Sequence, residues 1–523
     1  MKKRFLAFLM VLALLVGLTG GFSLAEEAHL AKADDGTAAA EAIAERKASG
    51  NMPTIVIGFL TFTGPGAGTE RVAAEMSKIT EEKLGIKVEL HILDMASYAQ
   101  QMNLMLASGE QVDMFNCVSV GFMPCVSKGY LLDLEEDDLL ATYGQGIIDA
   151  FRASELNGCR VAGTLYATPV KKDDAGGKFG MSIPTKYLDE IGVDWQSMYK
   201  NPDDEVIYTD FDFIEDVLGK LHEKYPDKTT FYTDPGSTVA QCLLMDAPGD
   251  QFGVLCDPVN SLEVTDLFSS DIYKELCARF YKWNQNGWIS PDAITETNAT
   301  TTQVKAGSLC AYKTATKPGI RQQESNLCGT PVAIFQLGQD FKASNTYSTM
   351  PWAINYGTED PVAAMQVLNL LYTDPDLSTL LCWGQEGKEW VETGDGHITF
   401  PEGVDAQNSE YYYNVNWEMP NQFIARVWEG DSLDIWTRMQ EWNDNALASK
   451  AMGFTFDNSD VSAEYTALTN VYNEFHKQLE LGFVDPEVGI PQFVERLKNA
   501  GLDHYISVKQ EQVNEWAAAN GIQ

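Results

Sequence analysis

Residues 54–93, "TIVIGFLTFTGPGAGTERVAAEMSKITEEKLGIKVELHIL", decide the fold class of this chain. An apolar run of strand length leads into a glycine-rich turn, and a segment with apolar residues at helical spacing follows. A second run then alternates apolar and polar residues like a half-buried strand. Strand, helix and strand in this order predict an α/β fold built on parallel sheet. The turn "TFTGPGAG" is either a ligand cradle at the end of the first strand or only a tight entry into the helix.

A dinucleotide is one ligand that such a turn could hold, but two features argue against it. Gly64, Gly66 and Gly68 give G-x-G-x-G, and Thr69 stands where the complete fingerprint needs its next glycine. The first 25 residues combine a basic start, an apolar run over 5–18 and a small-residue exit, which predicts a signal peptide cut after Ala25. An exported protein meets little NAD or ATP.

Composition fits an exported globular protein. The formal charge is −38, with 75 acidic and 37 basic residues, so the surface repels nucleic acid and anionic membrane. After the leader, no stretch approaches the roughly 20 apolar residues of a membrane span. The length predicts two or more lobes with sizeable cores. The nine cysteines are spread out with no CxxC pair, and most are predicted to be small buried hydrophobes.

Further along the chain, strand and helix patterns continue to alternate. "SLCAYKT" and "PVAIFQL" are predicted strands, "FDFIEDVLGKLHEKYP" is a predicted helix, and the chain after about Pro361 is mostly helical. Residues 26–52 are Ala-rich and charged with little to bury, which predicts a tether or linker.

Three blocks carry a resemblance to a known family: "TERVAAEMSKITEEKLGIKVELHILDMASYAQQMNLMLASGEQVDMF", "FYKWNQNGWISPDA" and "NDNALASKAMGFTFDNSDVSAEYTALTNVYNEFHKQLELGFVDPE". With them the chain resembles extracellular solute-binding proteins of ABC importers. The resemblance is to the large sugar-type family 1 and to a Gram-positive subgroup with a distinctive C-terminal region. It covers nearly all of the chain after the leader.

The resemblance implies a two-lobed periplasmic-binding-protein clamshell (type II) with a helix-rich C-terminal part. The expected N-terminal lobe is 53–169 plus 352–395, the C-terminal lobe is 175–349 plus 414–523, and the hinges lie near 168–174, 349–355 and 393–414. The implied function is capture of an extracellular carbohydrate, an oligosaccharide, in the cleft between the lobes, and its delivery to the transmembrane permease subunits.

The implied protein is a monomer without catalytic residues, metal or cofactor. It acts at the outer face of the cell membrane or in a periplasm. The chain departs from the lipoproteins of this family in one respect. Gly21 follows Leu18-Thr19-Gly20, and no cysteine precedes Cys117, so lipid attachment through a lipobox is in question.

A sugar-binding site needs amide, hydroxyl or carboxyl groups for the ring hydroxyls and aromatic rings for the flat C–H faces. Where the resemblance implies cleft loops, the candidate ligand-binding residues are Thr61, Thr63, Asn116, Ser119, Tyr166, Lys313, Trp352, Asn355, Trp417 and Asn421.

Two alternatives stay open. The same fold could bind a peptide or another small polar solute, and for a cation Asp113 and Asp173 are available carboxylates. A secreted glycan-active enzyme is the other alternative, since two carboxylates 5–10 Å apart could serve as acid and base. The chain has no G-x-S-x-G or H-E-x-x-H motif, and its six histidines are far apart in sequence.

Overall fold

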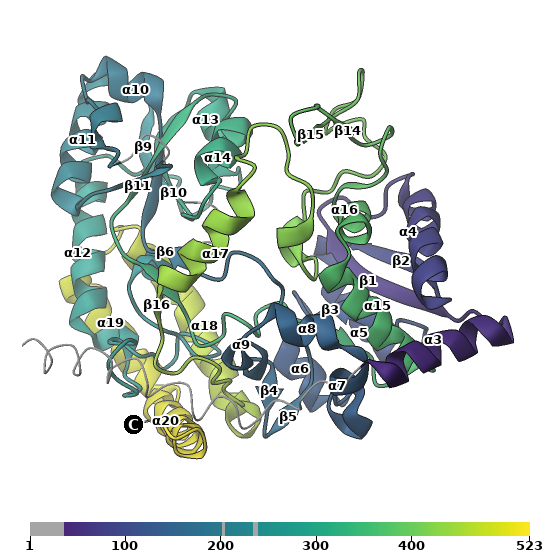
Figure 1. The fold of residues 1–523 in the computed structure, drawn as a ribbon. Helices are drawn as coiled ribbons and strands as arrows, with labels where there is room; N and C mark the ends of the chain where they lie inside the picture. The colour runs from purple at the N-terminus through teal and green to yellow at the C-terminus, as the bar shows by residue number, and fades with distance from the viewer. Residues whose placement is uncertain (1–35, 201–203, 234–238, 523) are drawn as a thin grey trace, which may run out of the picture.

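The computed structural model describes residues 36–200, 204–233 and 239–522. The predicted signal peptide and the first part of the predicted tether lie outside these residues. Two mixed sheets, each with its own helices, form two lobes that face one another across the centre of the molecule (Figure 1). Within the described residues, none of the helices combines the length and the apolar character that a membrane crossing requires.

The first lobe is built on a four-stranded sheet of order β13-β3-β1-β2, in which β13 alone runs antiparallel to its neighbour. Its strands are β1 (Thr54–Thr61), β2 (Lys87–Asp94), β3 (Met114–Asn116) and β13 (Trp352–Ile354). β1 lies inside the sheet and is buried along almost its whole length, which explains its unbroken apolar sequence. β2 lies at the edge and keeps the predicted alternation.

Helices cover this sheet on both faces. They are α4 (Thr69–Leu84), α5 (Met95–Ser108), α6 (Phe122–Ser127), α7 (Leu139–Tyr143), α8 (Gln145–Ala150), α9 (Ala153–Asn157), α15 (Pro361–Thr373) and α16 (Pro375–Trp383). α15 and α16 each begin at an Asp-Pro pair, where the aspartate caps the helix and proline takes its first position. A short hairpin joins β4 (Arg160–Val161) to β5 (Thr164–Leu165).

The predicted tether is partly a docked helix. Residues 37–49 form α3 (Thr37–Ser49), and Arg46 donates to the carbonyl of Leu84 at 3.0 Å and to the side chain of Gln366 at 2.9 Å. The C-terminal carbonyls of α4 attract the guanidinium, so the second half of this segment is fixed to the first lobe.

The second lobe has a five-stranded sheet of order β8-β11-β7-β10-β9. Its strands are β7 (Gly180–Pro184), β8 (Val206–Tyr208), β9 (Thr229–Tyr232), β10 (Leu309–Thr314) and β11 (Val332–Gln336). The helices beside it are α10 (Thr185–Glu190), α11 (Phe211–Lys224), α12 (Asp271–Gln285), α13 (Thr300–Ala306) and α14 (Ile320–Cys328). The strand predictions for "SLCAYKT" and "PVAIFQL" and the helix predicted for "FDFIEDVLGKLHEKYP" are confirmed.

Below this sheet the C-terminal helices form a third apolar cluster with α12 and with residues 240–268. They are α18 (Ser462–Glu480), α19 (Pro486–Asn499) and α20 (Leu502–Ala519); α17 (Ile435–Asn445) lies between the lobes (Figure 1). The small strands are β6 (Gly176–Gly177), β12 (Asp340–Lys342) and β16 (Leu447–Ala448) in one sheet, and the hairpin β14 (Val391–Glu392) with β15 (Ile398–Thr399). None of the nine cysteines is in a disulfide, and eight are buried, so the prediction for them is confirmed.

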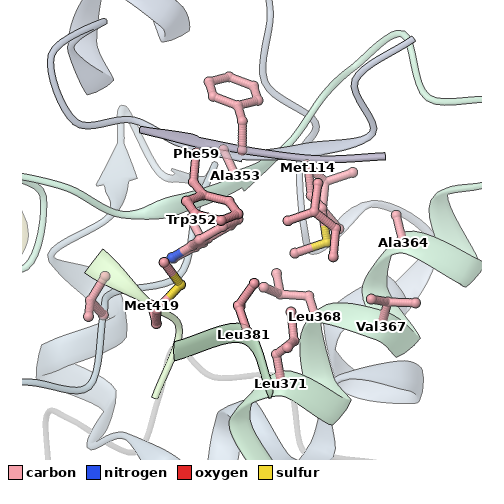
Figure 2. Packing of buried hydrophobic residues seen from close by; sticks show 14 of the residues in the cluster. Phe59, Met114, Trp352, Ala353, Ala364, Val367, Leu368, Leu371, Leu381 and Met419 are labelled. Atoms are coloured by element: carbon pink, nitrogen blue, oxygen red, sulfur yellow. The ribbon is translucent and has the colours of Figure 1, made fainter. Parts of the chain in front are cut away.

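The chain passes between the lobes three times. The first passage follows Thr168, which pairs with Trp352 of the first sheet, and ends at β6; the second joins β12 to β13. The position of the third passage differs from the hinge expected near 393–414. Ile398, Tyr411 and Met419 are buried in the first core, so this passage follows Ala425 instead. Figure 2 shows the reason: Trp352 of β13 lies against Met419, next to Leu381 of α16, and buries the apolar side of the 415–425 segment.

Candidate functional site

The carboxyl ends of the parallel strands of the first lobe meet at one edge of the sheet. Thr61 and Asp94, the last residues of β1 and β2, are register partners, and β3 ends beside them at Asn116. Open α/β sheets bind ligands outside this edge, so the loops that follow these strands are the first place to look for a site.

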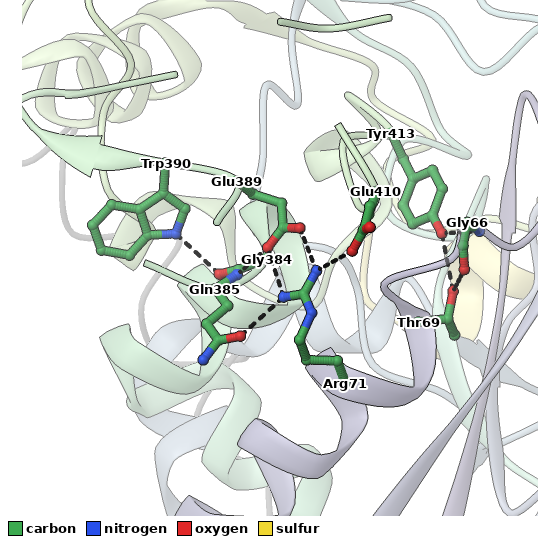
Figure 3. A network of polar contacts seen from close by, with 9 residues as sticks. All are labelled: Gly66, Thr69, Arg71, Gly384, Gln385, Glu389, Trp390, Glu410 and Tyr413. Atoms are coloured by element: carbon green, nitrogen blue, oxygen red, sulfur yellow. Dashed lines mark hydrogen bonds and ion pairs between the residues drawn. The ribbon is translucent and has the colours of Figure 1, made fainter. Parts of the chain in front are cut away.

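The glycine-rich turn after β1 is used for packing inside the lobe. The Gly66 N–H donates to the Tyr413 hydroxyl at 2.6 Å, and the Gly68 N–H donates to the Glu410 carbonyl at 3.0 Å (Figure 3). A Cβ at Gly66 would overlap that same carbonyl oxygen. The Thr61 hydroxyl, also a candidate, is buried and donates to the Gly64 carbonyl at 3.0 Å. The two glycine N–H groups are therefore occupied, and the tight-turn interpretation holds for this part of the loop.

An ion-pair network next to the turn fixes the same contact. Arg71, in the first turns of α4, donates to both carboxylate oxygens of Glu389, at 2.6 and 3.0 Å, and to Glu410 at 3.1 Å (Figure 3). Glu389 is 1% exposed and also accepts from the Gln385 N–H at 2.9 Å. A bidentate arginine with a buried carboxylate is the strong form of this interaction, so segment 384–413 is held firmly on α4.

Two aromatic rings remain open at the edge of the sheet. Phe62 directly follows β1 and is 55% exposed, and its ring centroid lies 6.4 Å from that of the half-buried Trp417, with the planes inclined at 46°. We call this pair the aromatic shelf. Thr63 follows Phe62 directly, Ser119 follows β3, and both are exposed. Ser119 has a φ of 63°, an unusual conformation for a residue other than glycine and one that is enriched at ligand-binding loops.

Asn116 is the side chain that organises this edge. Its amide donates to the carbonyls of Met350 at 3.0 Å and Glu418 at 3.1 Å, and its oxygen accepts from the Val118 N–H at 2.8 Å. Trp352 is fully buried and its indole N–H donates to the same Glu418 carbonyl at 2.6 Å. Both residues are sequence-predicted site residues. The structure shows that they position the segment that carries Trp417 rather than open to solvent.

The Glu418 side chain is buried directly below the shelf. In the described part of the chain, no group donates a hydrogen bond of ordinary geometry to its carboxyl oxygens, and burial raises the pKa of this carboxyl well above its ordinary value. The backbone N–H of Leu60 opposes this shift only in part. Burial therefore favours the neutral form of this carboxyl in the core of the lobe.

A pocket of about 160 Å³ lies where the first and second passages run together. Its polar lining includes Lys172, Asp173, Asp174, Asn345, Tyr347 and Thr349. We call it the hinge pocket. Met350 also lines it, and the Met350 carbonyl accepts from Asn116, so the hinge pocket adjoins the carboxyl edge of the first sheet.

The two aspartates of the hinge pocket are in opposite states. Burial alone would raise the pKa of Asp173, but Lys317 at 3.4 Å and Lys172 at 3.5 Å outweigh burial and hold it below its ordinary value. Burial, reinforced by Glu155, raises the pKa of Asp174 to about 7. One carboxylate is charged and paired, and the other is near half protonation at neutral pH.

The remaining predicted site residues are spread more widely. Asn421 is buried and donates to the Tyr372 carbonyl at 2.9 Å, and Asn355 donates to the Val112 carbonyl at 2.8 Å at the opposite edge of the sheet. Tyr166 packs half-buried on the first core, and Lys313 lies half-buried on β10 of the second lobe. Thr63 and Ser119 thus follow strands that end at the same edge of the sheet as the aromatic shelf, while Asn355 and Lys313 lie elsewhere.

Phe62 is absent from the sequence-based candidates, and so are the residues of the hinge pocket except Asp173, which was named only for a cationic ligand. A large aromatic residue directly after a buried parallel strand was a usable signal for Phe62. Within the described residues, no cluster of three or more His, Cys, Asp or Glu side chains has an arrangement that could hold a metal ion.

Comparisons with known proteins agree with this architecture. Residues 450–518 match a family model described as a domain of unknown function, DUF3502. Over 462 residues, 86% of this chain and 88% of the relative, the sequence is 23% identical to a carbohydrate ABC transporter substrate-binding protein of Streptococcus pneumoniae.

Solved structures show the same fold. The crystal structure of the N-glycan transport solute binding protein NgtS from S. pneumoniae superposes with a TM-score of 0.76 at 22% identity, covering 88% of this chain and 98% of that one. An extracellular solute-binding protein from Bifidobacterium longum subsp. infantis superposes with a TM-score of 0.60 at 16% identity. The match covers 89% of this chain and 98% of that one. The chain therefore has the two-lobed α/β fold of extracellular solute-binding proteins, as the sequence predicts. It is homologous along most of its length to a carbohydrate-type member of that class, so the predicted resemblance is confirmed.

Proposed function

We propose that this chain is the solute-binding component of an ABC importer and that it captures an extracellular oligosaccharide between its lobes. The observation that carries the proposal is the aromatic shelf at the carboxyl edge of the first sheet. Phe62 is 55% exposed and lies next to the half-buried ring of Trp417, so the pair offers a ligand an aromatic surface at this edge. Aromatic faces of this kind suit the C–H faces of sugar rings.

The relatives support the same ligand class. The S. pneumoniae protein NgtS has been crystallised in complex with Man1GlcNAc and with Man5GlcNAc, and a further structural neighbour, FusA from the same species, in complex with kestose. Because the two rings of the shelf are inclined at 46°, they cannot both lie flat on one sugar ring, so two neighbouring rings of an oligosaccharide fit them better than a monosaccharide does.

The mechanism is non-catalytic. Three passages of the chain join the lobes, and a ligand that contacts both lobes favours the closed arrangement by its difference in affinity for the two states. The closed form then presents the ligand to the transmembrane permease subunits. The protein acts outside the cytoplasmic membrane, as a monomer, and hands over its ligand chemically unchanged.

A thermal-shift screen of the mature chain tests this proposal. The ligands are Man1GlcNAc, kestose, mannose, a tripeptide mixture and spermidine. A ligand present at 100 times its dissociation constant adds about 2.7 kcal/mol of apparent stability, which a melting curve resolves. A shift with an oligosaccharide that is recovered intact supports the proposal. A shift only with peptide or spermidine, or hydrolysis of the glycan, contradicts it.

A further inference from the structure

The hinge pocket contains a carboxyl group that the protein itself leaves without a partner. Within the described residues, the Asp174 side chain makes no hydrogen bond or ion pair, and it lines the pocket as a half-buried group that solvent can still reach. A half-buried carboxyl group has given up part of its hydration, and a ligand hydroxyl can replace the lost water contacts by a hydrogen bond. A group kept in this state inside a pocket points to a ligand that satisfies it.

The backbone around Asp174 is held rigidly. Asn443 of α17 is fully buried, and its oxygen accepts from the N–H groups of Asp174 at 2.9 Å and Ala175 at 3.2 Å. The same amide donates to the Lys172 carbonyl at 2.7 Å. One side chain thus fixes the backbone of residues 172–175 and leaves the Asp174 carboxyl free, which is the arrangement of a preorganised binding group.

The other charges that line the pocket are already paired. Among the residues that line the pocket, Asp173 is paired with Lys317 and Lys172. Lys171 and Lys342 are also close enough to lower the pKa of Asp174, but neither lines the pocket. The other polar groups are the amide of Asn345 and the hydroxyls of Tyr347 and Thr349. A neutral, hydroxyl-rich ligand fits such a lining, because its hydroxyls both donate and accept.

The hinge pocket is also connected to the aromatic shelf. The Asn116 amide donates to Met350, which lines the pocket, and to Glu418, which directly follows Trp417. The Asn116 side chain thus links the segment that lines the pocket to the segment that carries Trp417. With room for several waters, the pocket can take a compact polar ring.

We propose that the hinge pocket is a sugar subsite in which the Asp174 carboxyl hydrogen-bonds the hydroxyls of one ring, while the aromatic shelf carries the adjoining rings. This inference rests on the proposed function and extends it to a named recognition group. The pocket is lined by both passages, so a ring bound there contacts two of the three segments that move when the lobes close. Asn443 is the positioning residue of the subsite.

Calorimetric titration with Man1GlcNAc tests the subsite on wild type, Asp174→Ala, Asp174→Asn and, as a matched control, the exposed Asp503→Asn. We expect Asp174→Ala to weaken binding about 10- to 100-fold, the range for a lost hydrogen bond to an ionisable group, and the conservative Asp174→Asn to recover part of it. Asp503→Asn binds like wild type. Without ligand, Asp174→Ala melts no lower than wild type, because it removes a carboxyl that has no partner.

A second measurement identifies which hydroxyl of the glycan Asp174 binds, and it begins with the wild-type protein. Monodeoxy analogues of Man1GlcNAc are titrated against wild type and then against Asp174→Ala. The hydroxyl that faces Asp174 is the one whose removal weakens wild type about tenfold or more but leaves the variant unchanged. If Asp174→Ala binds the glycan with wild-type affinity, the subsite is overturned and the proposed function still stands. The same holds if every analogue loses as much affinity for the variant as for wild type. Failure of wild type to bind any glycan overturns both.

Discussion

Phe62 and Trp417 lie with their ring centroids 6.4 Å apart although they come from opposite ends of the chain. Phe62 is placed by the end of β1, and Trp417 by the buried hydrogen bonds of Asn116 and Trp352 to the next residue, Glu418. The shelf is thus supported by side chains that never reach solvent. The residues expected to contact the glycan therefore differ from those that stabilise the lobe, so variants can test binding and stability separately.

Phe62→Ala and Trp417→Ala are each expected to weaken glycan binding about tenfold, because a ring that stacks on a sugar contributes about 0.5–1.5 kcal/mol beyond the area it buries. Titration calorimetry with the glycan identified by the screen measures this. Tyr356→Ala is the control, since Tyr356 is 67% exposed and follows β13, which runs to the opposite edge of the sheet. An equal loss in all three variants would mean that the shelf has no special part in binding.

Gly66→Ala is expected to lower the free energy of unfolding by about 1–3 kcal/mol, because its Cβ would overlap the Glu410 carbonyl and the turn would have to move. Denaturant unfolding checks the value. Gly176→Ala is the matched control, as a Cβ there meets nothing within 4 Å. If Gly66→Ala abolished glycan binding without loss of stability, the turn would be a ligand cradle after all.

Arg71→Ala is expected to destabilise the protein by about 3 kcal/mol. Removing the guanidinium leaves Glu389, whose side chain is 2% exposed, as an uncompensated buried carboxylate; the loss is at the low end for such pairs because the Arg71 side chain is 26% exposed. Arg496→Ala removes the exposed pair with Glu474 and should change stability by less than about 1 kcal/mol. Similar losses in the two variants would show that the Arg71 network is only a surface feature.

Glu418→Gln should stabilise the protein increasingly as the pH rises. The folded state holds the Glu418 carboxyl as an acid with a raised pKa, whereas the unfolded chain releases the proton near pH 4.5, so wild type loses stability above that pH by up to about 1.4 kcal/mol per pH unit. Glutamine resembles the neutral acid and does not titrate. Melting curves from pH 4 to pH 8 measure the difference, and a difference that stays constant with pH would contradict a buried neutral acid.

Much of the local structure could be predicted from the sequence because it depends on short-range patterns. The apolar run of β1, the alternation of β2 and the helical spacing of α4 each follow from which faces are buried. Thr63 and Ser119 could be named as candidates for a similar reason, since they follow strands whose ends can be located, and their part in binding stays a prediction, as does that of Trp417. The lobe boundary near 414 and the structural roles of Trp352 and Asn116 could not be predicted from local patterns, because they depend on which distant segment covers an apolar face.

The sequence by itself determined the α/β class, the succession of strand, helix and strand in the opening unit, and the likeness to two-lobed solute-binding proteins. Periodicity and long sequence blocks carry that information. Only the tertiary structure decided what the glycine turn does. Its N–H groups are satisfied by Tyr413 and Glu410, partners more than 300 residues away in sequence. The same is true of Asp174. Its unpaired state is a property of the pocket that two distant passages form, and no local pattern encodes which polar groups the folded chain leaves without a partner.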